Sequence, residues 1–134
     1  GILHDIGKIM LPSELLNKSE KLTVEEFELI KRHPEAGYQI LKSVDEYSTV
    51  AELILYHHER FDGDGYTEGL RGEEIPYGTR ILSVADAYEA MTAKRSYQRT
   101  KTREEAILEM RKHSGTQFDP AVVEVFLEKV LKVI

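Results

Sequence analysis

Hydrophobic residues recur every three or four positions along most of the chain, which is the period of an amphipathic helix. No segment shows a sustained alternation of apolar and polar residues, and no turn dipeptide joins two strand-like runs. The pattern therefore predicts an all-α fold, a packed bundle of about six helices without internal repeats.

Helix start signals divide this pattern into elements. Thr23, Thr49 and Thr102 are each followed three residues later by a glutamate, which is the capping-box pattern. Asp119 followed by Pro120 predicts another start, with a capping aspartate and proline at the first helical position.

Three of the predicted helices carry polar residues of chemical interest. Residues 24–33 are expected to form a helix that ends in His33, and residues 50–58 one that ends in His57 and His58. Residues 80–91 are nearly apolar throughout, which predicts a buried helix around Asp86. Between residues 59 and 78 the periodicity gives way to a glycine-rich loop, which suggests tight turns and close approach of a ligand to the backbone.

Size and composition narrow the class of protein. A chain of 134 residues is the size of one domain, and no apolar run approaches the roughly 20 residues of a membrane span, so no membrane contact is expected. The chain has no cysteine, which excludes disulfides and cysteine-based zinc sites and fits a cytoplasmic protein. Its net charge of -6 argues against a DNA-binding protein. Residues 90–103 nevertheless hold five basic residues and no acid, either as a solvated loop or as a phosphate-binding patch.

Six ionisable residues are expected to face inward from apolar segments: His4, Asp5, His33, His57, His58 and Asp86. The free-energy cost of burying that many unpaired charges would exceed the roughly 5–15 kcal/mol net stability of a domain. The six groups must therefore compensate one another. Histidine and aspartate without cysteine form the ligand set of a site for one or two divalent transition metals. Scattered, hydrogen-bonded core histidines are the alternative interpretation.

The segments that hold these residues resemble a known family. "HDIGK", "HPEAGY", "HHERFDGDGY", "ILSVADAYEAMT" and "SGTQFDP" resemble, in order and spacing, the HD-GYP subfamily of HD metal-dependent phosphohydrolases. The resemblance covers residues 1–134 as a single domain and implies an HD-type helical bundle. It also implies two divalent ions, or three, with iron or manganese expected first and zinc or magnesium as alternatives. The implied reaction is hydrolysis of cyclic di-GMP to linear pGpG or GMP by a metal-bridging hydroxide.

The resemblance assigns metal ligands residue by residue. Asp5 would bridge two ions, while His4 and Asp86 would serve one of them. The other ion would take three histidines: His33, His57 and His58. The bridging position makes Asp5 catalytic as well.

Three further residues would act on the substrate. Lys8, one turn after His4, would stabilise the phosphate or assist the leaving oxygen, although an exposed surface lysine is the simpler interpretation. Arg95, in the acid-free stretch, would contact a substrate phosphate, since a guanidinium can bind phosphate through two donors. Tyr66 would contact the substrate, or else only pack within its loop.

The chain departs from the family pattern in three respects. Thr67 follows Gly65 and Tyr66 where the family has proline, Glu89 replaces an aspartate, and Gln98 replaces a basic residue. The family also contributes another metal-binding histidine from an upstream helix. Because the chain begins three residues before His4, we expect an N-terminally truncated fragment of a longer protein, with a sensor or receiver domain upstream.

Two other functions remain open on this sequence. The chain could be a regulatory module that binds the nucleotide, or a diguanylate cyclase (GGDEF-type) domain, through residues 60–72 without turnover. It could also hydrolyse another nucleotide, because a metal-activated hydroxide attacks phosphorus whatever the base is.

Overall fold

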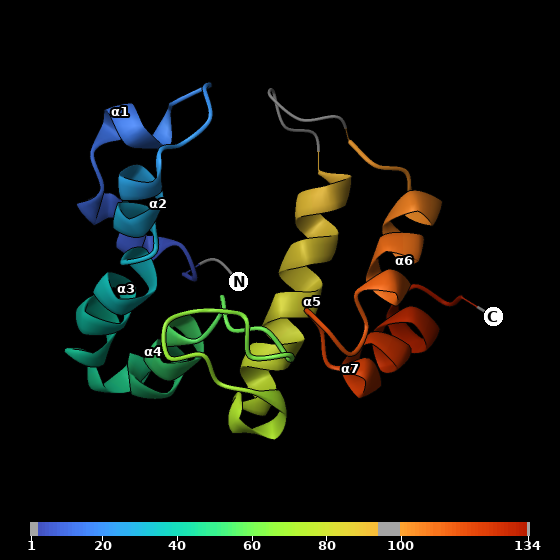
Figure 1. Cartoon of the computed structure of the whole chain (residues 1–134). Coiled ribbons are helices and arrows are strands. Elements are labelled where there is room, and N and C mark those ends of the chain that lie inside the picture. Colours follow the sequence, from blue (N-terminus) through green and yellow to red (C-terminus); the bar gives the residue numbers. More distant parts are fainter. Residues whose placement is uncertain (1–2, 94–99, 134) are drawn as a thin grey trace.

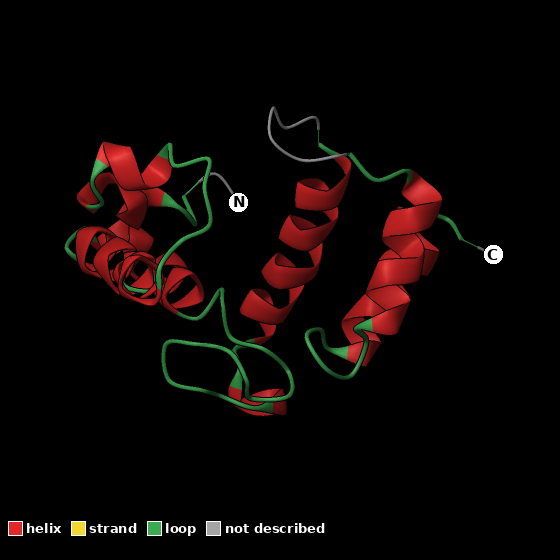
Figure 2. Cartoon of the chain, turned by 45° about the horizontal axis from the view of Figure 1, so that its top comes forward, coloured by secondary structure: helices red, strands yellow, loops and turns green. Residues whose placement is uncertain are grey.

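The computed structural model describes residues 3–93 and 100–133. This part of the chain is built from helices and loops and contains no β-strand, apart from one isolated bridge between Ser114 and Phe118 (Figures 1 and 2). The predicted all-α fold is confirmed. None of the described helices is long and apolar enough to cross a membrane.

The elements form two halves along the sequence (Figure 1). The N-terminal half contains η1 (Ile6–Met10), α1 (Ser13–Leu16), α2 (Val24–Ile30), α3 (His33–Lys42), η2 (Asp45–Tyr47) and α4 (Ser48–Leu55). The C-terminal half contains η3 (Gly72–Glu74), α5 (Tyr77–Thr92), α6 (Arg103–Lys112), α7 (Pro120–Val125) and the π-helical turn η4 (Phe126–Val130).

Most of the expected helix caps are present. Thr23 and Thr102 form capping boxes, and the Asp119 carboxylate accepts hydrogen bonds from the first N–H groups of α7. The cap expected at Thr49 is wrong, because α4 begins at Ser48 without a side-chain cap. The turn η2 runs directly into α4, and the Ser48 N–H is already satisfied by the Asp45 carbonyl.

The histidines lie outside the helices that were expected to carry them. α2 ends at Ile30, and His33 opens α3 instead, because Pro34 fits the first turn of a helix and not its interior. α4 ends at Leu55, so His57 and His58 lie in the turn that follows. The His57 N–H bonds the Ile54 carbonyl three residues back, a tighter turn than an α-helix allows.

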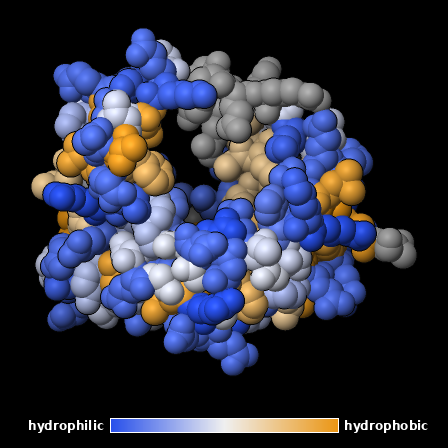
Figure 3. All heavy atoms as spheres, viewed as in Figure 1, coloured by the Kyte–Doolittle hydropathy of each residue, from blue (hydrophilic) through white to orange (hydrophobic). Residues whose placement is uncertain are grey.

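Each half of the fold is stabilised by its own apolar cluster. One lies between α3 and α4, and the other lies among α5, α6 and α7. Two hydrogen bonds join the halves: the Thr79 and Ser83 hydroxyls of α5 donate to the Leu53 and His57 carbonyls, each at 3.3 Å. The surface is hollowed where the halves meet (Figure 3). α5 is therefore not buried throughout as expected, and Ile81 is 45% exposed.

Gly7 allows η1 to cross α3 at backbone contact. A Cβ at this position would lie 1.8 Å from the His33 carbonyl oxygen and 2.6 Å from the Gly37 nitrogen. Only glycine fits such an approach. The contact sets the position of Asp5 and Lys8 relative to the first turn of α3.

Candidate metal centre

Three imidazoles converge between the two halves of the fold. His33 comes from the first turn of α3, and His57 and His58 come from the turn after α4. The His33 Nε2 lies 3.4 Å from the His57 Nε2 and 3.2 Å from the His58 Nε2. His33 and His57 are only 1% and 6% exposed, so water cannot solvate these ring nitrogens freely.

Backbone carbonyls fix the orientation of two of the rings. The His33 Nδ1 lies 2.6 Å from the Ile30 carbonyl oxygen, and the His57 Nδ1 lies 2.6 Å from the Ile54 carbonyl oxygen. A carbonyl can only accept, so each Nδ1 carries the proton and each Nε2 presents its lone pair to the cluster. Lone pairs that face one another at this distance repel unless a cation lies between them. The arrangement therefore fits a metal ion, and it is the usual way in which histidine ligands are oriented.

The same burial keeps the histidines neutral. Burial lowers the pKa of His57 to about 4 and that of His58 to about 3, and it also lowers the pKa of His33. At neutral pH the three rings are therefore uncharged, and the carbonyl contacts leave the Nε2 atoms of His33 and His57 without a proton. A metal ion would not have to displace protons from those two Nε2 atoms.

The carboxylates of Asp5 and Asp86 complete the cluster of predicted ligands. The Asp5 carboxylate lies 3.6 Å from the His33 Nε2 on one side and 3.5 Å from the His4 Nε2 on the other. The His4 Nε2 lies 3.0 Å from Asp86 Oδ1 on α5. The six side chains therefore lie together, with Asp5 between the group around His33 and the group around His4.

The two carboxylates are less buried than the sequence pattern predicted. Their side chains are 41% exposed for Asp5 and 35% for Asp86. The hydrogen bond from His4 lowers the pKa of Asp86. Burial would raise the pKa of Asp5, but the hydrogen bond and charge of Lys8 outweigh it and lower the pKa. Both groups are thus carboxylates at neutral pH, and both are open to a ligand.

Lys8 and Tyr66 lie beside the cluster. The Lys8 Nζ is 2.9 Å from Asp5 Oδ2. The Tyr66 ring stacks on His58 with ring centroids 4.8 Å apart, and burial raises the pKa of Tyr66 to about 12. Its hydroxyl therefore keeps its proton and can donate a hydrogen bond. Arg95, the third predicted substrate residue, lies outside the described residues.

Sequence reasoning missed Glu59, which organises the loop after the histidine pair. Its buried carboxylate accepts three backbone hydrogen bonds from the glycine-rich loop, from the N–H groups of Glu68, Gly69 and Leu70 at 2.6, 3.1 and 3.0 Å. The sequence does offer a signal for this role, because Glu59 directly follows the histidine pair and directly precedes the glycine-rich loop. The loop is therefore fixed from its base next to His58.

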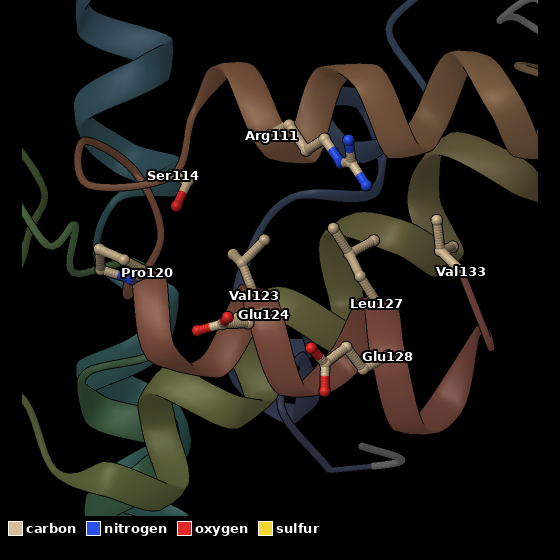
Figure 4. A pocket seen from close by; sticks show the side chains of 8 residues that line it. All are labelled: Arg111, Ser114, Pro120, Val123, Glu124, Leu127, Glu128 and Val133. Atoms are coloured by element: carbon tan, nitrogen blue, oxygen red, sulfur yellow. The ribbon is translucent and has the colours of Figure 1, made fainter.

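A pocket of about 290 Å³ opens on the cluster. It is lined by His57, His58, Glu59, Arg60, Tyr66, Ser83, Asp86, Ala87 and Gln117. A second groove, of about 370 Å³, lies between α6 and α7 (Figure 4). None of the six candidate ligands lines that second groove, so the first pocket is the one relevant to chemistry at the metal centre.

The chain is similar to an HD domain family model and to several cyclic dinucleotide phosphodiesterases. A family model described as HD domain matches residues 1–122. A cyclic di-GMP phosphodiesterase of Thermotoga maritima is 45% identical, over 94% of this chain and 35% of its own length. The cyclic di-GMP phosphodiesterase response regulator RpfG of Xanthomonas campestris is 43% identical, over 93% and 34%. A 3'3'-cGAMP-specific phosphodiesterase of Vibrio cholerae is 40% identical, over 94% and 24%.

The fold has a relative among solved structures. The crystal structure of the Vibrio cholerae cyclic GMP-AMP phosphodiesterase V-cGAP3 matches 98% of this chain and 36% of that chain, with a TM-score of 0.68 and 21% identity. The chain spans about a third of the length of the first curated relatives it matches. The chain belongs to the HD domain family and is related to the HD-GYP cyclic di-GMP phosphodiesterases.

Proposed function

We propose that the chain is the catalytic module of a metal-dependent phosphodiesterase that hydrolyses cyclic di-GMP to linear pGpG or GMP. The observation that carries the proposal is the convergence of the Nε2 atoms of three neutral histidines beside the Asp5 carboxylate, next to a pocket open to solvent. Related cyclic dinucleotide phosphodiesterases at 40–45% identity support the substrate class.

The chain offers ligands for two ions that share one carboxylate. His33, His57 and His58 would hold one ion, His4 and Asp86 would hold the other, and Asp5 would bridge them. Nitrogen and carboxylate ligands without sulfur suit iron or manganese, with zinc or magnesium as alternatives. Bound there, the ions would supply Lewis acidity, which activates water and neutralises charge on the attacked phosphodiester.

Two side chains would act directly on the substrate. Lys8 is already held beside the cluster by its 2.9 Å contact with Asp5, so its ammonium can stabilise a phosphate oxygen or protonate the leaving oxygen. Tyr66 keeps its hydroxyl proton and lines the pocket, so it can donate to the substrate. Arg95 would add a guanidinium for a phosphate.

The test is metal content and turnover of the protein in its full natural length. The protein is supplied anaerobically with Fe(II) or Mn(II), and products of cyclic di-GMP are separated by chromatography. We expect turnover that depends on metal, and Asp5→Ala should empty both ion positions. Asp64→Ala, at an exposed loop aspartate, is the matched control and should keep its metal. A fully metallated protein that leaves cyclic di-GMP intact would overturn the proposal.

A second candidate function rests on the glycine-rich loop. Its tip, residues 67–69, is exposed, while its backbone is held by Glu59. A rigid exposed loop suits a docking site for a diguanylate cyclase domain. Titration calorimetry with a purified domain of that type measures the contact, and Glu68→Lys should abolish it. Binding unaffected by that charge reversal would remove the loop from the interface.

A further inference from the structure

The loop between α6 and α7 contributes one more residue to the pocket that opens on the metal centre. Gln117 lines this pocket together with three of the candidate ligands: His57, His58 and Asp86. Two backbone hydrogen bonds fix the loop against the segment that follows the histidines. The Phe61 N–H donates to the Gln117 carbonyl at 3.2 Å, and the Asp62 N–H donates to the Thr116 carbonyl at 2.8 Å. Gln117 therefore has a set position relative to the cluster.

The two residues after Gln117 both have evident structural roles. Phe118 is buried in the apolar cluster of the C-terminal half. Asp119 caps α7 and pairs with Arg80 at 2.5 Å. Gln117 is half-buried, yet its carboxamide makes no hydrogen bond within residues 3–93 and 100–133. Its backbone is held in place, and its side chain is left to the pocket.

Most other polar side chains of the pocket are already engaged. Glu59 accepts the loop N–H groups, Arg60 binds Asp62 through two hydrogen bonds of 3.0 and 2.6 Å, and Ser83 donates to the His57 carbonyl. Outside the candidate metal ligands, two further polar groups of the pocket make no hydrogen bond within the described residues. They are the Tyr66 hydroxyl and the Gln117 carboxamide.

We propose that the Gln117 carboxamide hydrogen-bonds an edge of a guanine base of the bound cyclic dinucleotide, an inference that rests on the proposed phosphodiesterase function. A carboxamide offers donors and an acceptor side by side, which match the mixed donors and acceptors of a nucleobase edge. A phosphate offers acceptors only and is better matched by a cation such as Lys8. Gln117 is thus a specificity-determining residue, and the metal centre itself is indifferent to the base.

The test separates recognition of the base from the chemistry at phosphorus. The manganese-loaded full-length protein is assayed on cyclic di-GMP, on cyclic di-AMP and on bis(p-nitrophenyl) phosphate, a phosphodiester without a nucleobase. Gln117→Met keeps the length of the side chain and removes its hydrogen bonds. We expect KM for cyclic di-GMP to rise roughly tenfold or more, and the preference over cyclic di-AMP to shrink by a similar factor. Metal content and kcat/KM for the base-free diester should stay within about twofold.

The matched control is Gln39→Met, at an exposed glutamine of α3 that does not line this pocket and should leave all three substrates unaffected. An unchanged KM for cyclic di-GMP in Gln117→Met overturns the inference and leaves the proposed function intact. Equal losses on all three substrates, or loss of metal, also overturn it, because they indicate a structural role. Metallated wild-type protein that hydrolyses only the base-free diester overturns the proposed function and this inference with it.

Discussion

Replacement of Gly7 by alanine tests how the fold positions the metal centre. A Cβ at this position would lie 1.8 Å from the His33 carbonyl oxygen, 2.8 Å from the His33 carbonyl carbon and 2.6 Å from the Gly37 nitrogen. All three are backbone atoms of α3, so no side chain can rotate away to make room. Either η1 moves away from α3, or the first turn of α3 distorts.

The size of the effect follows from the geometry. To restore ordinary van der Waals contact, η1 has to move by roughly 1.5 Å. Such overpacking costs about 1–3 kcal/mol of the free energy of unfolding. The same movement displaces Asp5, now 3.6 Å from the His33 Nε2, beyond the ~0.5 Å tolerance of a metal site. We therefore expect Gly7→Ala to lower metal affinity by about 10- to 100-fold in addition to its effect on stability.

Urea unfolding of the metal-free protein measures the first effect, and calorimetric titration with Mn(II) measures the second. Gly72→Ala is the matched control, because a Cβ there meets nothing within 4 Å although φ is +59°. Its left-handed backbone should cost about 1–2 kcal/mol without changing metal affinity. If Gly7→Ala loses stability but binds Mn(II) as the wild type does, this contact does not position Asp5. If neither quantity changes, the close crossing of η1 and α3 is itself refuted.

Three further outcomes follow from the contacts. The metal-free protein should lose stability as pH falls from about 6.5 to about 4, by up to about 3 kcal/mol from His57 alone. The reason is that His57 resists protonation in the folded state but not in the unfolded state. Urea midpoints that stay level over this pH range would contradict the prediction. Glu59→Gln removes hydrogen-bond acceptors from the loop N–H groups and should lower the free energy of unfolding by about 1–3 kcal/mol. Amide hydrogen exchange at residues 68–70 should become faster. Exchange at the wild-type rate there would show that Glu59 does not hold the loop. Asp119→Asn keeps the cap of α7 but breaks the ion pair with Arg80. Its thermal midpoint should therefore fall further than that of Thr102→Ala, which loses a helix cap worth about 1 kcal/mol. The reverse order of the two midpoints would refute this ranking.

Local patterns in the sequence predicted local structure well. The capping boxes at Thr23 and Thr102 and the Asp119–Pro120 start are present as expected, because each depends on groups within four residues of one another. Where local signals competed, the helix boundaries differ from the predicted ones. Thr49 does not cap a helix, because the preceding turn runs directly into α4. His33 lies at the start of α3 and not at the end of α2, because Pro34 favours the first turn of a helix.

The relation between distant residues could not be read from periodicity. His4 and Asp86 meet at 3.0 Å only because α5, which belongs to the C-terminal apolar cluster, packs beside the N-terminal half. Likewise, Gln117 reaches the pocket through backbone bonds between its loop and the segment after His58. The partial exposure of Asp5 and Asp86 likewise depends on how the two halves pack.

The sequence by itself determined the helical class, most helix starts and the chemical types of the candidate ligands, because these depend on side-chain spacing along the chain. Only the tertiary structure decided that three Nε2 atoms face one another, that Glu59 fixes the loop, and that Gln117 remains available to a ligand. Those features arise from packing between segments far apart in sequence. That packing is governed by close contacts such as the one at Gly7, which no periodic pattern records.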